Sequence, residues 1–128
     1  MEQSREVLDS ACALASVGGD TDFLREIAGL VQAAWPTLLG NLRKDLAAGD
    51  LRALEADARL ARVASEYVSA KRARASALQL QKMVGLGDLG GAHRATTQLE
   101  EEVAELQLVL ATFRAATYAP RSHPAEAR

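Results

Sequence analysis

Residues 51–68, LRALEADARLARVASEYV, decide the fold that the sequence predicts. Apolar or small side chains recur at spacings of three and four along this stretch, which is typical of one buried face of an α-helix. The predicted buried stripe is narrow and consists of Leu51, Leu54, Ala58, Ala61, Ser65 and Val68. Because most of these side chains are small, a neighbouring helix can pack close to this one. The stretch therefore predicts a helix within a closely packed helical protein.

The same spacing recurs on both sides of this stretch and predicts four further helices. Their approximate bounds are 2–16, 22–48, 70–84 and 88–116. Turns that contain glycine, which reaches the left-handed backbone easily, separate most of them and lie at 18–19, 49–50 and 85–87. Such short connections place consecutive helices antiparallel. We therefore predict an all-α protein, an antiparallel four-helix bundle with a short N-terminal capping helix.

Individual residues refine this prediction. Asp20 or Thr21 can cap the long second helix. Pro36 falls inside that helix, where proline removes one backbone hydrogen bond, so we expect a kink there. Cys12 and Trp35 are expected in the core. The predicted buried face of the first helix consists of Val7, Leu8, Ala11, Leu14 and Ala15.

The composition limits the classes of function. The chain has 128 residues, of which 48% are hydrophobic and 25% charged, as in a soluble globular domain. A net charge of -2 gives no general attraction to nucleic acid or to a membrane surface, so we expect neither as a partner. A single cysteine forms no intrachain disulfide, and no apolar run is long enough to span a bilayer, which together predict a cytoplasmic protein.

Domain organisation and cofactor use are simple to predict. Residues 1–117 are expected to form one domain, and 118–128, which contains prolines and has no helical period, is expected to be disordered. The sequence contains no cluster of metal ligands, no phosphate-binding loop and no catalytic triad, so we expect no metal and no cofactor.

Three stretches, taken in their order and spacing, are similar to a known family. They are VLDSACALASVGGDTDFLREIAGLV at 7–31, LRKDLAAGDLRALEADA at 42–58 and GLGDLGGAHRATTQLEEEVAELQLVL at 85–110. Together they resemble the histidine-containing phosphotransfer (HPt) domain of bacterial two-component phosphorelays. The resemblance covers about 7–113, nearly the whole chain, and implies the same helical bundle and a place in two-component signalling.

The active helix of that family carries the pattern A-H-x-L-K-G, followed after a few residues by L-G-A. Here ARLARV at 58–63 falls on the first part, so that the phosphate-accepting histidine corresponds to Arg59, the lysine to Arg62 and the glycine to Val63. The L-G-A positions are held by Val68, Ser69 and Ala70. A guanidinium stays protonated and cannot replace imidazole as a nucleophile. The resemblance therefore implies a degenerate member that is not an enzyme.

In the resembled family the outer side of this helix docks on a receiver domain. Six residues share that side here: Arg52, Glu55, Arg59, Arg62, Val63 and Glu66. Arginines at 59 and 62 can hold a carboxylate or a phosphoryl group, whereas Val63 adds bulk and Glu66 adds a negative charge. The resemblance implies a receiver domain of a response regulator or a sensor histidine kinase as partner. The alternative is a solvated helix face with Arg–Glu pairs at helical spacing.

Other notable residues have simpler interpretations. His93 is the second candidate nucleophile, although an ordinary surface histidine is the simpler interpretation, and His123 is not expected to be catalytic. The basic run KRAR at 71–74 and the acidic run EEEVAE at 100–105 are interpreted as exposed helix surfaces.

Three functions remain open. The favoured one is a degenerate HPt-like module of a two-component system that binds a receiver domain or a sensor kinase without accepting phosphate. The second is an active phosphotransfer protein that uses His93. The third is a helical bundle for self-association, a homodimer, unrelated to a phosphorelay.

Overall fold

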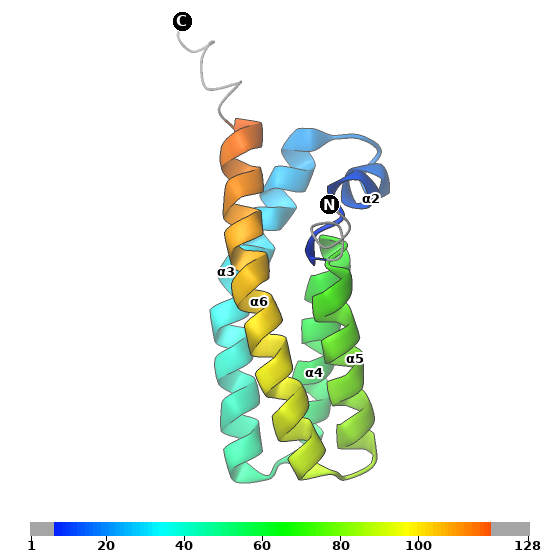
Figure 1. Cartoon of the computed structure of the whole chain (residues 1–128), viewed down its shortest axis with the longest axis vertical. Coiled ribbons are helices and arrows are strands. Elements are labelled where there is room, and N and C mark those ends of the chain that lie inside the picture. The colour runs from blue at the N-terminus through cyan, green and yellow to red at the C-terminus, as the bar shows by residue number, and fades with distance from the viewer. Residues whose placement is uncertain (1–6, 119–128) are drawn as a thin grey trace, which may run out of the picture.

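Five α-helices account for most of residues 7–118, the part of the chain that the computed structural model describes (Figure 1). No residue of this part lies in a strand, so the predicted all-α class is confirmed. The helices are α2 (Ser10–Ser16), α3 (Thr21–Ala48), α4 (Leu51–Tyr67), α5 (Lys71–Gly85) and α6 (Leu89–Tyr118).

Aspartate side chains begin four of the helices. Asp9, Asp20, Asp50 and Asp88 precede α2, α3, α4 and α6, and each carboxylate accepts a hydrogen bond of 2.8–3.1 Å from the backbone N–H three residues further on. This bond satisfies a donor that has no partner within the helix. At its other end α3 stops at Gly49, whose φ of 65° is reached most easily by glycine. The predicted turn at 49–50 is confirmed, and Asp20 is the cap of α3.

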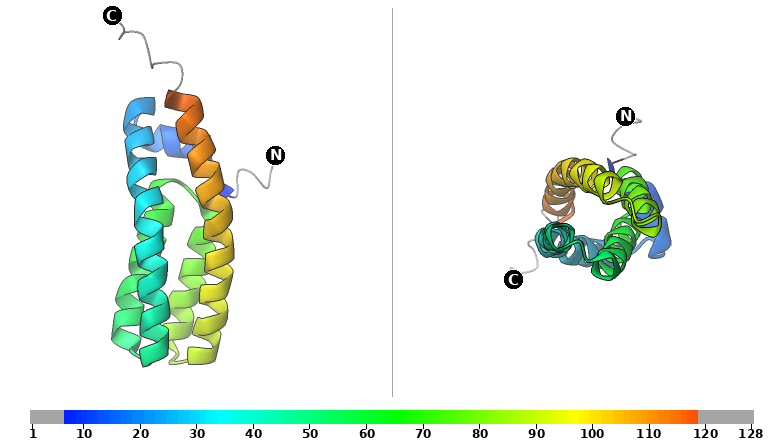
Figure 2. Two further views of the ribbon diagram at one scale, coloured as in Figure 1. Left: turned by 90° about the vertical axis from the view of Figure 1, so that its left-hand side faces the viewer. Right: turned by 90° about the horizontal axis from the view of Figure 1, so that it is seen from below.

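The four long helices enclose one core. α3 packs mainly against α4 and α6, and α5 packs mainly against the same two helices. Viewed along the long axis of the molecule, the helices therefore form a ring (Figure 2). The short helix α2 packs against α3 at one end of the ring. None of the helices in the described part is long and apolar enough to cross a membrane.

Large side chains of α3 and α6 meet small ones of α4 and α5 in this core. Trp35 of α3 is fully buried, as predicted, and so are the α6 residues Leu99, Leu106 and Leu110. α4 and α5 face the core with several alanines. The predicted buried residues Leu54, Ala58, Ala61, Ser65 and Val68 are confirmed, and α5 contributes Ala73, Ala77, Leu80 and Val84 at the same helical spacing. Leu51 is the exception, because as the first residue of α4 it lies beside the turn and is exposed.

The predicted first helix is interrupted at residues 8–9. Asp9 caps α2, so the helix starts at Ser10 and does not run unbroken from residue 2. The chain before it is fixed by a different contact, in which the backbone N–H of Asp9 donates to the carbonyl of Ser69 at 3.1 Å. Val7 and Leu8 are buried, as predicted. Residues 1–6 lie outside the described part, and so does 119–128, which covers most of the predicted tail.

The interruption at Asp9 changes which side of α2 is buried. Ala13 faces the core, whereas Ala11 and Ala15, which were predicted on the buried face, are exposed. Cys12 is exposed as well, so its predicted place in the core is wrong. These errors in α2 have one cause: the prediction continued one helical period through Asp9, whereas Asp9 caps a new helix.

Pro36 leaves α3 continuous but frees one of its carbonyl groups. Proline has no N–H, so the carbonyl of Gln32, four residues earlier, lacks its helical donor. The side-chain Nε2 of Gln107 on α6 donates to that carbonyl at 2.9 Å. Figure 1 shows the early turns of α3 leaning across the bundle while its later turns run along it, as expected of a kinked helix.

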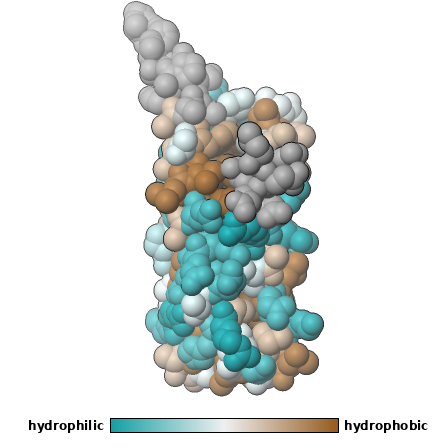
Figure 3. All heavy atoms as spheres, in the orientation of Figure 1, coloured by the Kyte–Doolittle hydropathy of each residue, from teal (hydrophilic) through white to brown (hydrophobic). Residues whose placement is uncertain are grey.

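Ion pairs further tie the helices together. Arg43 of α3 makes a two-pronged contact with Glu100 of α6, with Nε donating at 2.8 Å and Nη2 at 2.7 Å. The hydrogen bonds from Arg43 lower the pKa of Glu100. On the face formed by α5 and α6, Nη2 of Arg72 lies 3.3 Å from Oε1 of Glu105. The middle of that face is hydrophilic (Figure 3). Of the charged residues in the basic and acidic runs, Lys71, Arg74, Glu101 and Glu105 are exposed as predicted, whereas Arg72, Glu100 and Glu102 are half-buried in ion pairs or hydrogen bonds.

Asp45 of α3 is a buried carboxyl group. It is 8% exposed, and its Oδ2 has no hydrogen-bond partner within the described part. Burial raises the pKa of Asp45 to about 6, with further contributions from a hydrogen bond to Asp57 and from the negative charges of Asp57 and Asp50. The folded protein thus binds a proton at Asp45 more tightly than the unfolded chain does. This contribution to stability is complete below pH ~4 and is lost as the pH rises through about 6.

We predict that Asp45→Asn raises the free energy of unfolding at neutral pH. A pKa of about 6 in the folded state, against ~3.9 in the unfolded chain, corresponds to at most about 3 kcal/mol of lost stability. The amide stays neutral, so the gain should disappear as the pH falls toward 4. Urea denaturation across this range measures it, and the exposed Glu55→Gln is the matched control. An Asp45→Asn protein less stable than wild type at neutral pH would contradict the assignment.

Candidate functional site

The outer surface of α4 carries the six residues that the sequence singles out. They are Arg52, Glu55, Arg59, Arg62, Val63 and Glu66. Four of them are exposed, whereas Arg62 and Val63 are half-buried. Ala58 and Ala61 are fully buried on the opposite side, as predicted. The helix therefore divides cleanly into a core side and an outer side.

Arg59 is an unpaired cation of this surface. Its side chain is exposed and has no hydrogen bond or ion pair within residues 7–118. Its position on a long, well-packed helix nevertheless fixes where it can reach. A guanidinium in this state can donate two parallel hydrogen bonds to a carboxylate or phosphoryl group of another molecule.

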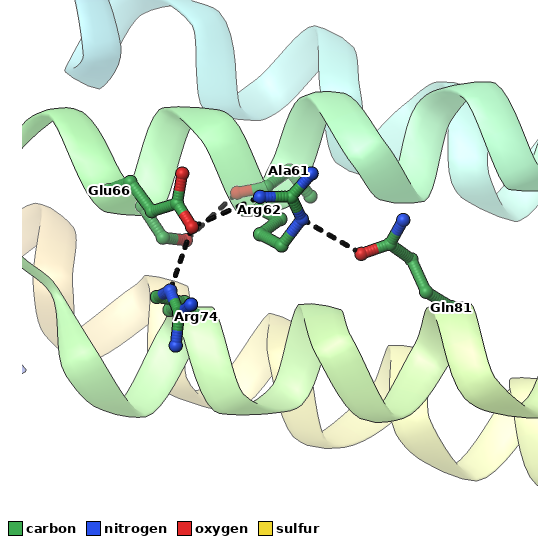
Figure 4. Close-up of polar contacts among 6 residues, drawn as sticks. Ala61, Arg62, Glu66, Arg74 and Gln81 are labelled. Carbon is green, nitrogen blue, oxygen red and sulfur yellow. Dashed lines mark hydrogen bonds and ion pairs between the residues drawn. The ribbon is translucent and has the colours of Figure 1, made fainter.

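Arg62 and Glu66 are engaged within the protein (Figure 4). Arg62 Nε donates to Oε1 of Gln81 on α5 at 3.0 Å, and Arg62 Nη1 donates to Glu66 Oε2 at 3.1 Å. The same Glu66 oxygen accepts from Nε of Arg74 on α5 at 2.8 Å. These four side chains form a polar network that joins α4 to α5.

The network fixes the charge state of Glu66. The hydrogen bond from Arg74 is the main cause that lowers the pKa of Glu66, and Arg62 acts in the same direction. Glu66 is thus an ionised group whose charge is already balanced by two arginines. It presents less free negative charge to a partner than the sequence alone indicates.

Arg62 corrects one expectation from the sequence. It was expected to face solvent as freely as Arg59, but its side chain is only 27% exposed and is directed toward α5. The pair Arg62–Glu66 has the spacing of four residues that a solvated helix face commonly shows. Part of the outer surface therefore has a structural role, and Arg59 does not.

An apolar groove of about 600 Å³ lies between α3 and α4. The wall formed by α4 consists of Leu60, Val63, Ala64 and Tyr67, so it includes Val63 of the outer surface. Arg59 immediately precedes Leu60 in the sequence. The wall formed by α3 consists of Phe23, Ile27, Leu30, Val31, Ala34 and Leu38.

Sequence reasoning missed this groove. Its exposed members Phe23, Leu30, Leu60 and Tyr67 fall beside the periodic positions that predicted the core. A signal was present, because apolar residues at 60, 63 and 67 repeat at spacings of three and four next to the buried stripe of α4. Their pairing with α3, however, requires the tertiary structure.

His93 lies on a different part of the surface. It is exposed in the first turns of α6, and its backbone carbonyl accepts a hydrogen bond of 3.1 Å from Oγ1 of Thr97. Because α4 packs mainly against α3 and α5, His93 and Arg59 belong to helices that are not neighbours in the ring. The two candidate positions of the sequence therefore do not form one site.

Comparisons with known proteins assign no family. No protein-family model matches the chain, and no characterised protein or solved structure matches it either. Within residues 7–118 no three His, Cys, Asp or Glu side chains group as ligands for a metal ion. The chemistry of the site therefore has to be inferred from the outer surface of α4 and the groove beside it.

We predict that Arg62→Ala lowers the free energy of unfolding by about 1 kcal/mol, because it removes a hydrogen bond to Gln81 and an ion pair with Glu66. Arg59→Ala is the matched control on the same helix and should leave stability nearly unchanged. Chemical denaturation of both variants measures the difference. Equal stabilities would show that the network does not hold α4 to α5.

Proposed function

We propose that the chain is an antiparallel four-helix bundle of the HPt type, with α2 as its cap, that binds a receiver domain or a sensor histidine kinase and accepts no phosphate. The closed ring of α3, α4, α5 and α6, joined by short turns, supports the fold part of this proposal. The outer surface of α4 is the proposed binding surface.

The backbone after α4 supports the alignment with the HPt pattern. Ser69 has a φ of 54°, in the left-handed region that favours glycine. The pattern has a glycine at this position, in its L-G-A segment. A chain that keeps an unfavourable turn without the glycine is consistent with descent from a sequence that had one.

The observation that carries the proposal is the exposed and unpaired Arg59 at the position of the phosphate-accepting histidine. A side chain at this position is directed away from the core, since Ala58 and Ala61 face inward. The pocket of a receiver domain that takes up phosphate is rich in carboxylates. A guanidinium can bind such a pocket and cannot take a phosphoryl group from it.

We predict that Arg59→Ala weakens binding to the cognate receiver domain by about tenfold, because one charge-assisted contact is lost. Added salt should weaken the wild-type complex as well. Calorimetry with purified receiver domains of the source organism measures both effects. Arg94→Ala, an exposed arginine on α6, is the matched control and should bind like wild type. If Arg59→Ala binds as tightly as Arg94→Ala, the outer surface of α4 is not the docking site.

We further predict that the chain stays unlabelled when it is incubated with a receiver domain or kinase that carries labelled phosphate, since position 59 has no imidazole. Arg59→His restores the nucleophile, and Val63→Gly added to it reduces bulk beside it, so the double variant should gain label. Acid-labile, base-stable label on the wild-type chain that His93→Gln removes would overturn this view and assign phosphotransfer to His93.

A further inference from the structure

Exposed large apolar side chains gather in one place on this protein. Nine of them are exposed within the described part, and four of the nine line the groove between α3 and α4: Phe23, Leu30, Leu60 and Tyr67. Leu30 is 73% exposed and Tyr67 is 58% exposed. Contiguous apolar surface is unfavourable in water, and on soluble proteins it marks sites of interaction. The groove is therefore the strongest candidate on the described surface for a protein contact.

The groove has two distinguishable ends. Phe23 lies near the start of α3 and marks the first end. Leu38 and Leu60 are the lining residues closest along the chain to the turn at 49–50, which joins the two helices, and they mark the second end. Leu30 lies between the two ends on the α3 wall.

Opposite charges flank the two ends. Glu26 stands on α3 between Phe23 and Leu30 and is exposed near the first end. Arg59 adjoins Leu60 and is exposed near the second end. Neither charged side chain has a hydrogen bond or ion pair within residues 7–118. An unpaired carboxylate thus lies near one end of the groove and an unpaired guanidinium near the other.

Such a surface is complementary to itself. A two-fold axis that crosses the groove reverses one copy of the chain relative to the other. The Glu26 end of each copy then faces the Arg59 end of its partner, so that two equivalent charge contacts form together. Leu30, the most exposed side chain of the groove, meets the partner's groove near the axis.

We propose that a second copy of this chain docks in the groove between α3 and α4 through a two-fold axis, with Leu30 of each copy in the groove of the other and Glu26 facing the partner's Arg59. The net charge of -2 per chain opposes this association only weakly. A stable interface covers about 800 Å² of each partner, which is roughly a ninth of the 7031 Å² surface. The groove and its flanks extend along α4 from Leu60 to Tyr67 and along α3 from Phe23 to Leu38.

The dimer has a consequence for the proposed receiver-binding surface. Arg59 belongs to both surfaces, so a chain paired with a second copy cannot offer it to a receiver domain. Self-association would then regulate access to α4. The dimer itself does not depend on any role in a phosphorelay, and it is tested with the chain alone.

Sedimentation of the purified chain over a range of concentrations tests the proposal. The wild type should sediment as a dimer at high concentration. Leu30→Glu should raise the dissociation constant about tenfold or more, because it places a charge in an apolar contact. Leu108→Glu is the matched control, since Leu108 is 71% exposed on α6, away from the groove, and this variant should dimerise like wild type. Circular dichroism and melting curves show whether each variant stays folded.

Charge reversal tests the two-fold arrangement. Glu26→Arg and Arg59→Glu should each weaken the dimer by about tenfold, since each opposes like charges. The double variant should regain wild-type affinity, because the pair is restored with its signs exchanged. Failure of the double variant to recover would overturn this orientation.

The remaining outcomes also decide the proposal. A wild-type chain that stays monomeric at every concentration overturns it, and so does a dimer that Leu30→Glu leaves intact. If the chain is monomeric and a receiver domain protects the groove from hydrogen exchange, the groove belongs to that partner and the dimer is wrong. A dimer that forms while receiver domains fail to bind leaves this proposal standing and removes the proposed function.

Discussion

The close packing of small side chains along α4 and α5 is the constraint on which the rest of the structure depends. Alanines at 58, 61, 73 and 77 are almost fully buried, so the backbones of these two helices lie close to the core. The remaining space is filled by large side chains from α3 and α6, of which Trp35 is the largest. A larger residue at any of these alanines would force the ring apart. The outer side of α4, which carries Arg59, does not pack in this core.

A contact between α3 and α6 compensates for the backbone hydrogen bond that Pro36 removes from α3. Pro36 deprives the carbonyl of Gln32 of its helical donor, and Gln107 of α6 supplies another. Arg43 and Glu100 hold the same two helices together closer to the turn at 49–50. α3 can therefore carry a kink and still form one firm wall of the groove. A binding surface on packed helices is held more accurately than one on loops.

The outer surface of α4 has three parts with different roles. Toward α5, Arg62 and Glu66 are used to hold the helices together. Toward α3, Val63 and its neighbours form the wall of an apolar groove. Between them Arg59 is free. An apolar centre flanked by a free arginine has the composition of a protein interface. This arrangement suits the binding of another protein.

The sequence by itself determined where the four long helices lie and which side of each is buried. For α3, α4 and α5 the predicted bounds agree with the structure within one residue at each end, because helical period, aspartate caps and glycine turns are local properties. The same local reasoning failed at Cys12, since Asp9 starts a new helix and is held by Ser69 from a distant part of the chain. Only the tertiary structure decided that Arg62 donates to Gln81 and that the side chain of Gln107 donates to the backbone carbonyl of Gln32. It also decided that a groove opens between α3 and α4. Each of these depends on which helices are neighbours and at what level they meet, and no periodicity within one helix contains that information.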